Sequence, residues 1–217
     1  MSATAIVAAA VAGAVGYLIG SLSSGYLVGK LYRNVDLRSL GSGSTGATNT
    51  FRTLGPGAGV LVAGLDILKG IAAVWVAREL LMPANEDPRY AEALAAIGAV
   101  AGHCWPITLR GRGGRGVATG FGALLMIATP AWAIAVAAFV LAIGITRMVS
   151  VGSLASVLGA LVGYLTSVAA GWLGFHPATL AFILVAGAIV YVRHVPNLQR
   201  IARGVEPRIG RPRETGA

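Results

Sequence analysis

The chain has 217 residues, of which 56% are hydrophobic and only 12% charged, and it carries a formal net charge of +9. Soluble domains contain about one-quarter charged residues, so this composition, with a mean hydropathy of +0.75, predicts a protein embedded in a lipid bilayer and excludes an ordinary soluble one. The single cysteine, Cys104, excludes an intramolecular disulfide and a CxxC metal site.

Seven apolar segments follow one another along the chain. The first lacks the basic start of a signal peptide and is too long for one, so we expect a retained transmembrane helix. Crossing the hydrocarbon core takes roughly 20 helical residues, and the fourth and fifth segments fall short of this. They form one apolar run interrupted at Thr129-Pro130-Ala131, which is either a single kinked helix or a hairpin of two short helices. The segments lie at about residues 5–28, 58–81, 91–109, 117–129, 131–145, 149–173 and 178–192.

The distribution of basic residues favours the hairpin. With seven spans and the N-terminus outside, all Lys and Arg residues except Lys69, Arg78 and Arg89 fall on the inner side, which is 14 of the 17, in agreement with the positive-inside rule. A single helix over residues 117–146 would place the chain after Arg193 on the opposite side and split this set. We therefore predict an all-α integral membrane protein with seven transmembrane helices, an outer N-terminus and a cytoplasmic C-terminus. The one-sided charge reflects orientation in the membrane, so we expect no nucleic-acid partner.

Three inner loops carry most of the polar chemistry: residues 40–52, 102–119 and 194–206. Two of them match GxGxxG, at 41–46 and 111–116, but a dinucleotide fingerprint needs a strand before it, and here the neighbours are membrane helices. A Walker A motif is also excluded because Ala47 stands in the lysine position. A glycine-rich backbone beside arginines suits anions such as phosphate. The alternative is a flexible cytoplasmic turn whose arginines only orient the protein.

Several polar side chains lie beside these loops. Asn49 and Arg52 are one helical turn apart, so both could face one ligand. Asp66 and Lys69 have the same spacing inside the second span, where ionisable groups are either functional or a mutually neutralising pair. His103 and His194 end apolar spans at the inner face, where they could contact phosphate or substrate. No metal site is expected, and a nucleophile formed by Cys104 and a histidine would lack an orienting third residue.

Four segments together resemble the bacterial acyl-phosphate:glycerol-3-phosphate acyltransferases. They are, in order, GSGSTGATNTFR at 41–52, LDILKG at 65–70, GHCWPITLRGRGGRGVAT at 102–119 and HVPNLQRIARGVE at 194–206. The resemblance spans most of the chain. It implies a seven-span enzyme of the bacterial plasma membrane whose active site faces the cytoplasm. Such an enzyme transfers a fatty acyl group from acyl phosphate to the 1-hydroxyl of glycerol 3-phosphate, giving lysophosphatidic acid and phosphate, without a cofactor.

The resemblance also implies the residues of the site. The family carries asparagine where this chain has Ser44, lysines at Arg112 and Arg115, and an aromatic residue at Gly111. Arginine retains the charge and can bind phosphate bidentately. The implied partners are glycerol 3-phosphate, acyl phosphate, membrane lipids and the upstream enzyme that forms acyl phosphate. Residues 1–204 are expected to form one transmembrane domain. The basic cytoplasmic tail, 205–217, contains two prolines and no apolar face, so its composition predicts partial disorder. The implied catalytic residues are Ser42, His194 and Asn197, and the implied substrate-binding residues are Gly43, Thr48, Asn49, Arg52, Lys69, His103, Arg112, Gly113, Gly114, Arg115 and Glu206.

Two other functions fit part of the sequence. A small transporter or channel for an organic anion would suit the basic loops and glycine-rich spans, but it needs polar residues at mid-membrane and an outer mouth. A purely structural membrane protein would leave the clustering of serine, threonine, asparagine and arginine in the first loop unexplained.

Overall fold

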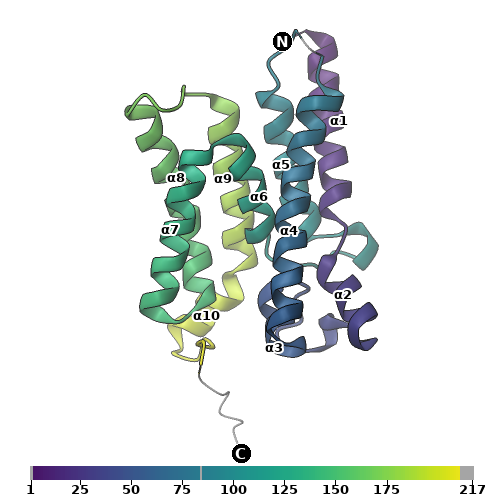
Figure 1. Ribbon diagram of the computed structural model, residues 1–217, viewed down its shortest axis with the longest axis vertical. Coiled ribbons are helices and arrows are strands. Elements are labelled where there is room, and N and C mark those ends of the chain that lie inside the picture. The colour runs from purple at the N-terminus through teal and green to yellow at the C-terminus, as the bar shows by residue number, and fades with distance from the viewer. Residues whose placement is uncertain (1, 84, 211–217) are drawn as a thin grey trace, which may run out of the picture.

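The computed structural model describes residues 2–83 and 85–210, and this part of the chain is helical, with no strand. The long helices run along the long axis of the molecule, with the start of the first helix at the upper end and the last helix at the lower end (Figure 1). Their bounds are α1 Ala3–Gly20, α2 Ser24–Arg33, α3 Ala47–Leu54, α4 Pro56–Val76, α5 Arg89–Cys104, α6 Val117–Ile127, α7 Thr129–Thr146, α8 Val149–Ala169, α9 Pro177–Arg193 and α10 Val195–Ala202; 3₁₀ turns at Leu37–Ser39 and Ile107–Leu109 and a π turn at Ala77–Leu81 complete them.

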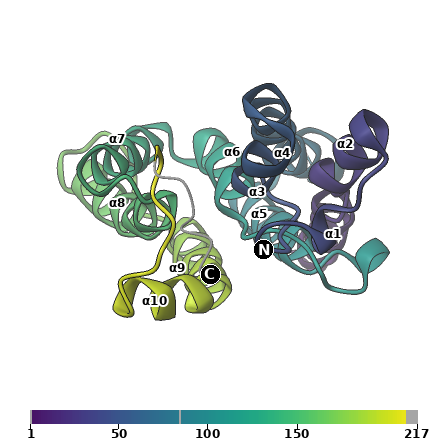
Figure 2. The same ribbon diagram turned by 90° about the horizontal axis from the view of Figure 1, so that it is seen from below.

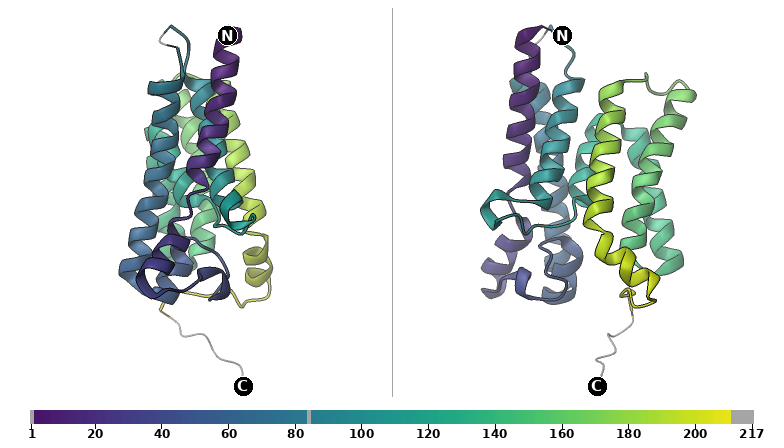
Figure 3. Two further views of the ribbon diagram at one scale, coloured as in Figure 1. Left: turned by 90° about the vertical axis from the view of Figure 1, so that its right-hand side faces the viewer. Right: turned by 180° about the vertical axis from the view of Figure 1, so that it is seen from behind.

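The helices form two groups joined by α6. One group holds α1 to α5 and the other holds α7 to α10, as the view from below shows (Figure 2). Helix α6 packs against α4 and leads into α7, while α5 contacts α9. Both groups therefore contribute to the lower half of the molecule, where the loops of residues 40–52, 102–119 and 194–206 lie (Figure 3).

Small residues bring the helices close together. A Cβ atom at Gly16 or Gly20 of α1 would collide with the backbone of Ala95 or Ala99 of α5, and one at Gly102 would collide with Tyr17. Pairs of small residues four apart let two membrane helices approach until their backbones touch. This packing explains much of the high glycine content of the spans.

The apolar run of residues 117–146 is a hairpin. The chain breaks at Ala128, and the rings of Phe121 and Phe139 meet edge to face with their centroids 5.6 Å apart. In one continuous helix these residues would lie about 27 Å apart, at 1.5 Å per residue. The hairpin predicted from the basic residues is therefore confirmed.

The first apolar segment differs from the single helix that we predicted. It breaks at residues 21–23 between α1 and α2. Side chains from other segments satisfy two carbonyls at the break: Lys69 Nζ donates to Leu22 O at 3.1 Å, and Thr108 Oγ1 donates to Ser21 O at 3.3 Å. These donors come from distant segments.

Two short helices at the lower end were also not predicted. Helix α3 is separated from α4 by Gly55, at φ +97°, and by Pro56, which begins α4. Helix α10 is bent by 55° from α9 at His194 (Figure 3). Both helices lie below the apolar spans, beside the polar loops.

Five helical segments of the described chain are long and apolar enough to cross a membrane, or six if the bent α9–α10 pair counts as one. Helix α6, with 11 residues, is shorter than a full span. The described chain is thus an all-helical, multi-pass membrane protein, and seven spans stay a prediction.

Candidate active site

A cavity of about 220 Å³ lies where the three inner loops meet. The first loop, α4, the end of α5, the start of α6 and the end of α9 all contribute to its wall, and α7 and α8 close the far side. Segments as far apart in sequence as Ser42 and His194 thus form one surface. The polar residues lining it are Ser42, Ser44, Thr48, Asn49, Asp66, His103, Arg115, Ser153 and His194.

Asn49 holds the first loop in shape. Its Nδ2 donates to the carbonyls of Leu37, Leu40 and Ser44 at 2.8–3.2 Å, and its Oδ1 accepts from the N–H of Ser42 at 2.9 Å. The loop needs left-handed backbone at Gly41, with φ +60°. Both N–H donors of the buried Asn49 amide are therefore used by the loop, and its oxygen accepts one hydrogen bond from the same loop.

The first loop leads into the N-terminus of α3, which faces the cavity. Gly46 precedes the helix and supplies no side-chain cap, and Ala47 and Thr48 of the first turn line the cavity. The first N–H groups of a helix lack partners within it and carry partial positive charge. This end of the cavity is therefore suited to an anion.

Gly113 and Gly114 of the second loop pack tightly and do not line the cavity. The N–H of Gly114 donates to His103 O at 3.0 Å, and its carbonyl accepts from Arg193 Nε at 3.0 Å. A Cβ atom at Gly114 would collide with the imidazole of His103, and one at Gly113 with the His103 carbonyl. The two glycines thus bring the loop against the end of α5 and fix the position of His103.

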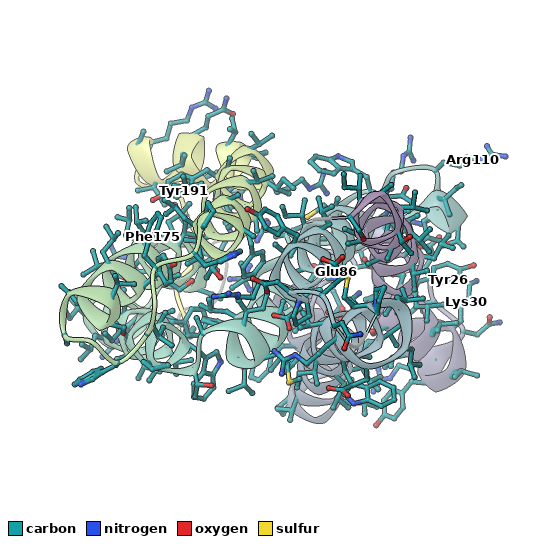
Figure 4. All side chains as sticks on the ribbon, turned by 90° about the horizontal axis from the view of Figure 1, so that it is seen from above. Tyr26, Lys30, Glu86, Arg110, Phe175 and Tyr191 are labelled. Carbon is teal, nitrogen blue, oxygen red and sulfur yellow. The ribbon has the colours of Figure 1, made fainter. Side chains whose placement is uncertain are left out.

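Arg115 is the cation of this loop that faces the cavity. Within residues 2–83 and 85–210 it has no hydrogen-bond or ion-pair partner. Burial lowers the pKa of its guanidinium to about 10, and the nearby charge of Arg200 contributes. At neutral pH the group is still charged, so it is a partly buried cation that an anion would stabilise. Arg112 is exposed, and Arg110 lies at the outer edge of the molecule on the same side as Tyr26 and Lys30 (Figure 4).

The two predicted histidines both line the cavity. His194 is buried, and its Nδ1 lies 2.8 Å from the carbonyl of Val190. A carbonyl only accepts hydrogen bonds, so Nδ1 carries the proton in the neutral ring and Nε2 keeps a lone pair. His194 Nε2 can therefore accept a proton or a hydrogen bond from a bound ligand.

His103 belongs to a buried cluster around Asp66. Asp66 Oδ1 lies 2.9 Å from Lys69 Nζ and 3.4 Å from His103 Nδ1, and it accepts from Ser24 Oγ at 3.0 Å. The pair of Asp66 and Lys69 is thus mutually neutralising, one of the two alternatives that the sequence left open. Asp66 also lines the cavity, which Lys69 does not.

The third loop is held together by Glu206. Its Oε1 accepts from Asn197 Nδ2 at 2.6 Å and its Oε2 from Arg200 Nε at 2.7 Å. Burial alone would raise the pKa of this carboxyl, but these hydrogen bonds hold the pKa below its ordinary value of 4.5. The segment then crosses toward the α7–α8 turn (Figure 2), where Ile209 N donates to Arg147 O at 2.8 Å. Asn197 and Glu206 therefore fix the C-terminal segment and do not line the cavity.

A second, larger cavity of about 590 Å³ adjoins the first and shares Ser42 and Thr48 with it. Its wall is mostly apolar, with Phe51, Val60 and Ile209 among its residues, and Arg52 is one of its cations. The two cavities share a boundary, and the smaller one carries more of the polar side chains, among them Asp66, His103 and His194.

Seven predicted site residues line one cavity or the other, and seven do not. Lys69, Gly113 and Gly114 contact residues that do, while Gly43 shapes the first loop with φ +72°. The sequence analysis did not include Asp66 or Ser153 among the implied site residues, although it noted Asp66 as an ionisable group within a span, which is the signal that could have placed it there. In the described chain no group of three or more His, Cys, Asp or Glu residues could hold a metal. The lining residues are Ser42, Thr48, Asn49, Arg52, His103, Arg115 and His194; the others are Gly43, Lys69, Arg112, Gly113, Gly114, Asn197 and Glu206.

The chain is similar to one family of known proteins over most of its length. The family model described as glycerol-3-phosphate acyltransferase matches residues 10–204. A glycerol-3-phosphate acyltransferase of Synechococcus sp. (strain CC9902) is 41% identical over 197 residues, covering 91% of this chain and 93% of the relative. One from Halalkalibacterium halodurans is 42% identical over 202 residues, covering 92% and 94%.

The fold is similar to solved structures as well. The crystal structure of PlsY (YgiH), an integral membrane glycerol 3-phosphate acyltransferase, in its glycerol 3-phosphate form superposes with a TM-score of 0.82 at 32% identity, covering 93% of this chain and 96% of that one. Its lysophosphatidic acid form gives a TM-score of 0.80 at 31% identity, covering 93% and 95%.

Proposed function

This chain belongs to the glycerol-3-phosphate acyltransferase family, and we propose that it transfers a fatty acyl group from acyl phosphate to the 1-hydroxyl of sn-glycerol 3-phosphate. The products are 1-acyl-glycerol 3-phosphate, which is lysophosphatidic acid, and inorganic phosphate. This is the first acylation step of phospholipid biosynthesis. No cofactor takes part in the proposal.

The observation that carries the proposal is the polar cavity formed by all three loops, with Arg115 unpaired at its wall within the described chain. A phosphate at the N-terminus of α3 would meet helix N–H groups, the hydroxyls of Ser42 and Thr48, and the Arg115 guanidinium. Charge-assisted hydrogen bonds of this kind are about twice as strong as neutral ones. Glycerol 3-phosphate is small and highly polar, which suits this compartment.

The second substrate suits the adjoining cavity. Acyl phosphate combines a phosphate with a fatty chain, and this cavity combines Arg52 with the apolar side chains of Phe51, Val60 and Ile209. Shared residues at the boundary, Ser42 among them, would bring the carbonyl of the donor next to the hydroxyl of the acceptor. Alignment of this kind supplies much of the rate of a two-substrate reaction.

Transfer is direct in the proposed mechanism. The 1-hydroxyl oxygen attacks the carbonyl carbon of acyl phosphate, the new C–O bond forms, and the bond from that carbon to the phosphate oxygen breaks, so that phosphate leaves. Nearby cations stabilise the leaving group. The hydroxyl proton passes to His194 Nε2 or to a phosphate oxygen of the substrate. Asn197 and Glu206 act by keeping α10 and the C-terminal segment in place.

We further propose seven spans, with the N-terminus outside and the site facing the cytoplasm of a bacterial plasma membrane. This rests on the side on which basic residues gather. In the proposal residues 1–204 form one transmembrane domain followed by a basic tail, 205–217, of which residues 211–217 lie outside the described structure. In this proposal the enzyme that forms acyl phosphate is a partner, because it supplies the donor substrate.

The test is an acyltransfer assay on purified full-length protein. Radiolabelled glycerol 3-phosphate is incubated with palmitoyl phosphate, palmitoyl-CoA or palmitoyl-acyl carrier protein, and labelled lysophosphatidic acid is measured. We expect product with palmitoyl phosphate alone. Product with a thioester donor alone would refute the donor assignment, and absence of product with every donor, from protein that melts cooperatively, would refute the function.

A further inference from the structure

Asp66 has one oxygen that the protein does not use. Its side chain is 1% exposed, and Oδ1 is surrounded by Lys69 Nζ, Ser24 Oγ and His103 Nδ1. The other oxygen, Oδ2, is buried and has no hydrogen-bond partner among the described residues. A buried acceptor without a donor destabilises the folded state unless a ligand or water supplies one.

The side chain lies on the wall of the polar cavity. The Lys69 ammonium at 2.9 Å stabilises the carboxylate in its charged form, and a charged carboxylate only accepts hydrogen bonds. A phosphate dianion brings no donor and cannot satisfy Oδ2, whereas a hydroxyl group can. Different parts of the cavity wall therefore suit different groups of a ligand. Arg115 and the α3 N-terminus suit its phosphate, and Asp66 suits a hydroxyl.

We propose that Asp66 Oδ2 accepts a hydrogen bond from the 2-hydroxyl of the glycerol phosphate acceptor and so selects a polyol phosphate over a simple alkanol phosphate. This inference rests on the proposed function. The reacting 1-hydroxyl loses its proton during transfer, and His194 Nε2 or a substrate phosphate can take that proton. The 2-hydroxyl keeps its proton throughout and needs a fixed acceptor, which Asp66 provides.

The substrate pair that tests this is sn-glycerol 3-phosphate and propane-1,3-diol monophosphate. Both have the reacting hydroxyl and the phosphate, and the second lacks only the 2-hydroxyl. A site built to bind a hydroxyl discriminates strongly against an analogue without it, so wild-type kcat/KM should be at least ~10-fold higher for glycerol 3-phosphate. Equal values in the wild type would overturn the inference and would leave the proposed function intact. A wild type that acylates neither would instead refute the function.

Variants then assign the preference to Asp66. The pair Asp66→Leu with Lys69→Met removes both charges with side chains of similar shape, which avoids an unpaired buried charge. In this double variant the ratio of kcat/KM for glycerol 3-phosphate to kcat/KM for propane-1,3-diol monophosphate should fall to about one, whatever the absolute rate. Asp66→Asn is the second variant: Lys69 and Ser24 hold the amide oxygen at the Oδ1 position, which leaves a neutral NH₂ group in place of Oδ2, so the preference should fall severalfold.

Ser24→Ala is the matched control. It removes one donor to Oδ1 and leaves Oδ2 unchanged, so it should keep the wild-type preference even if stability falls. A wild-type preference retained in either Asp66 variant, with the melting transition preserved, would show that another group contacts the 2-hydroxyl.

Discussion

Replacing Arg115 by alanine should separate catalysis from stability. The guanidinium lines the polar cavity, burial lowers its pKa to about 10, and it has no ion-pair partner in the described part of the chain. A charge-assisted hydrogen bond to phosphate contributes about 1.5–3 kcal/mol, so Arg115→Ala should lower kcat/KM roughly 10- to 150-fold. The same change removes a partly buried cation that is repelled by Arg200, Arg52 and Arg193 and attracted by Glu206, with burial as the largest unfavourable effect. We therefore expect no decrease in Tm.

The assay measures initial rates of lysophosphatidic acid formation over a range of glycerol 3-phosphate concentrations, with Tm recorded in the same detergent. Arg115→Lys should retain more activity than the alanine variant, because it keeps the charge and loses only the bidentate geometry. Arg203→Ala removes an exposed arginine after α10 and is the control for net charge. Wild-type kinetics in Arg115→Ala would refute the assignment of this cavity to phosphate. A large loss of Tm would refute the view that Arg115 is kept for binding.

Three further predictions concern topology, the absence of a covalent intermediate, and pH. Cysteine labelling in intact cells should reach Ser2 and Glu86, which lie at one end where Ser2 N contacts Glu86 Oε1 at 3.3 Å, but should not reach Ala217; labelling of Ser2 and Ala217 from the same side would contradict seven spans. Because Cys104 is buried and transfer is direct, Cys104→Ala should keep near-normal turnover, and radioactive acyl phosphate alone should label no protein; ping-pong kinetics or a stable adduct would disprove this. The hydrogen-bonded Glu206 has a pKa below 4.5 in the folded protein, so its stabilising contribution is complete above that value and is lost as pH falls through the lower, folded pKa. The wild-type Tm should therefore fall more steeply on acidification than that of Glu206→Gln, and parallel Tm curves for the two proteins would show that Glu206 does not contribute.

Much of the architecture is encoded locally in the sequence. The apolar composition predicted the membrane class, and the pattern of basic residues favoured the hairpin at Pro130 that the ring contact of Phe121 with Phe139 confirms. The glycine-rich loops predicted an anion site, and the ordered motifs indicated the family to which the chain belongs. These properties depend on composition, charge and short-range spacing, which can be read from the chain without its fold.

The role of each side chain was decided by the tertiary structure. The sequence suggested that Asn49 binds substrate, but its amide forms hydrogen bonds with the backbone of the first loop. The sequence also suggested that Gly114 belongs to a phosphate-binding loop, but Gly114 packs against the imidazole of His103. The sequence could only suggest that Asp66 forms an ion pair with Lys69. The fold shows that Oδ1 makes this ion pair, that Oδ2 has no hydrogen-bond partner among the described residues, and that Asp66 lines a cavity. Likewise, a carbonyl at the break after α1 accepts a hydrogen bond from Lys69, 47 positions away. Such features arise where atoms of distant segments meet, and a one-dimensional pattern carries no information about which atom of a side chain is already satisfied.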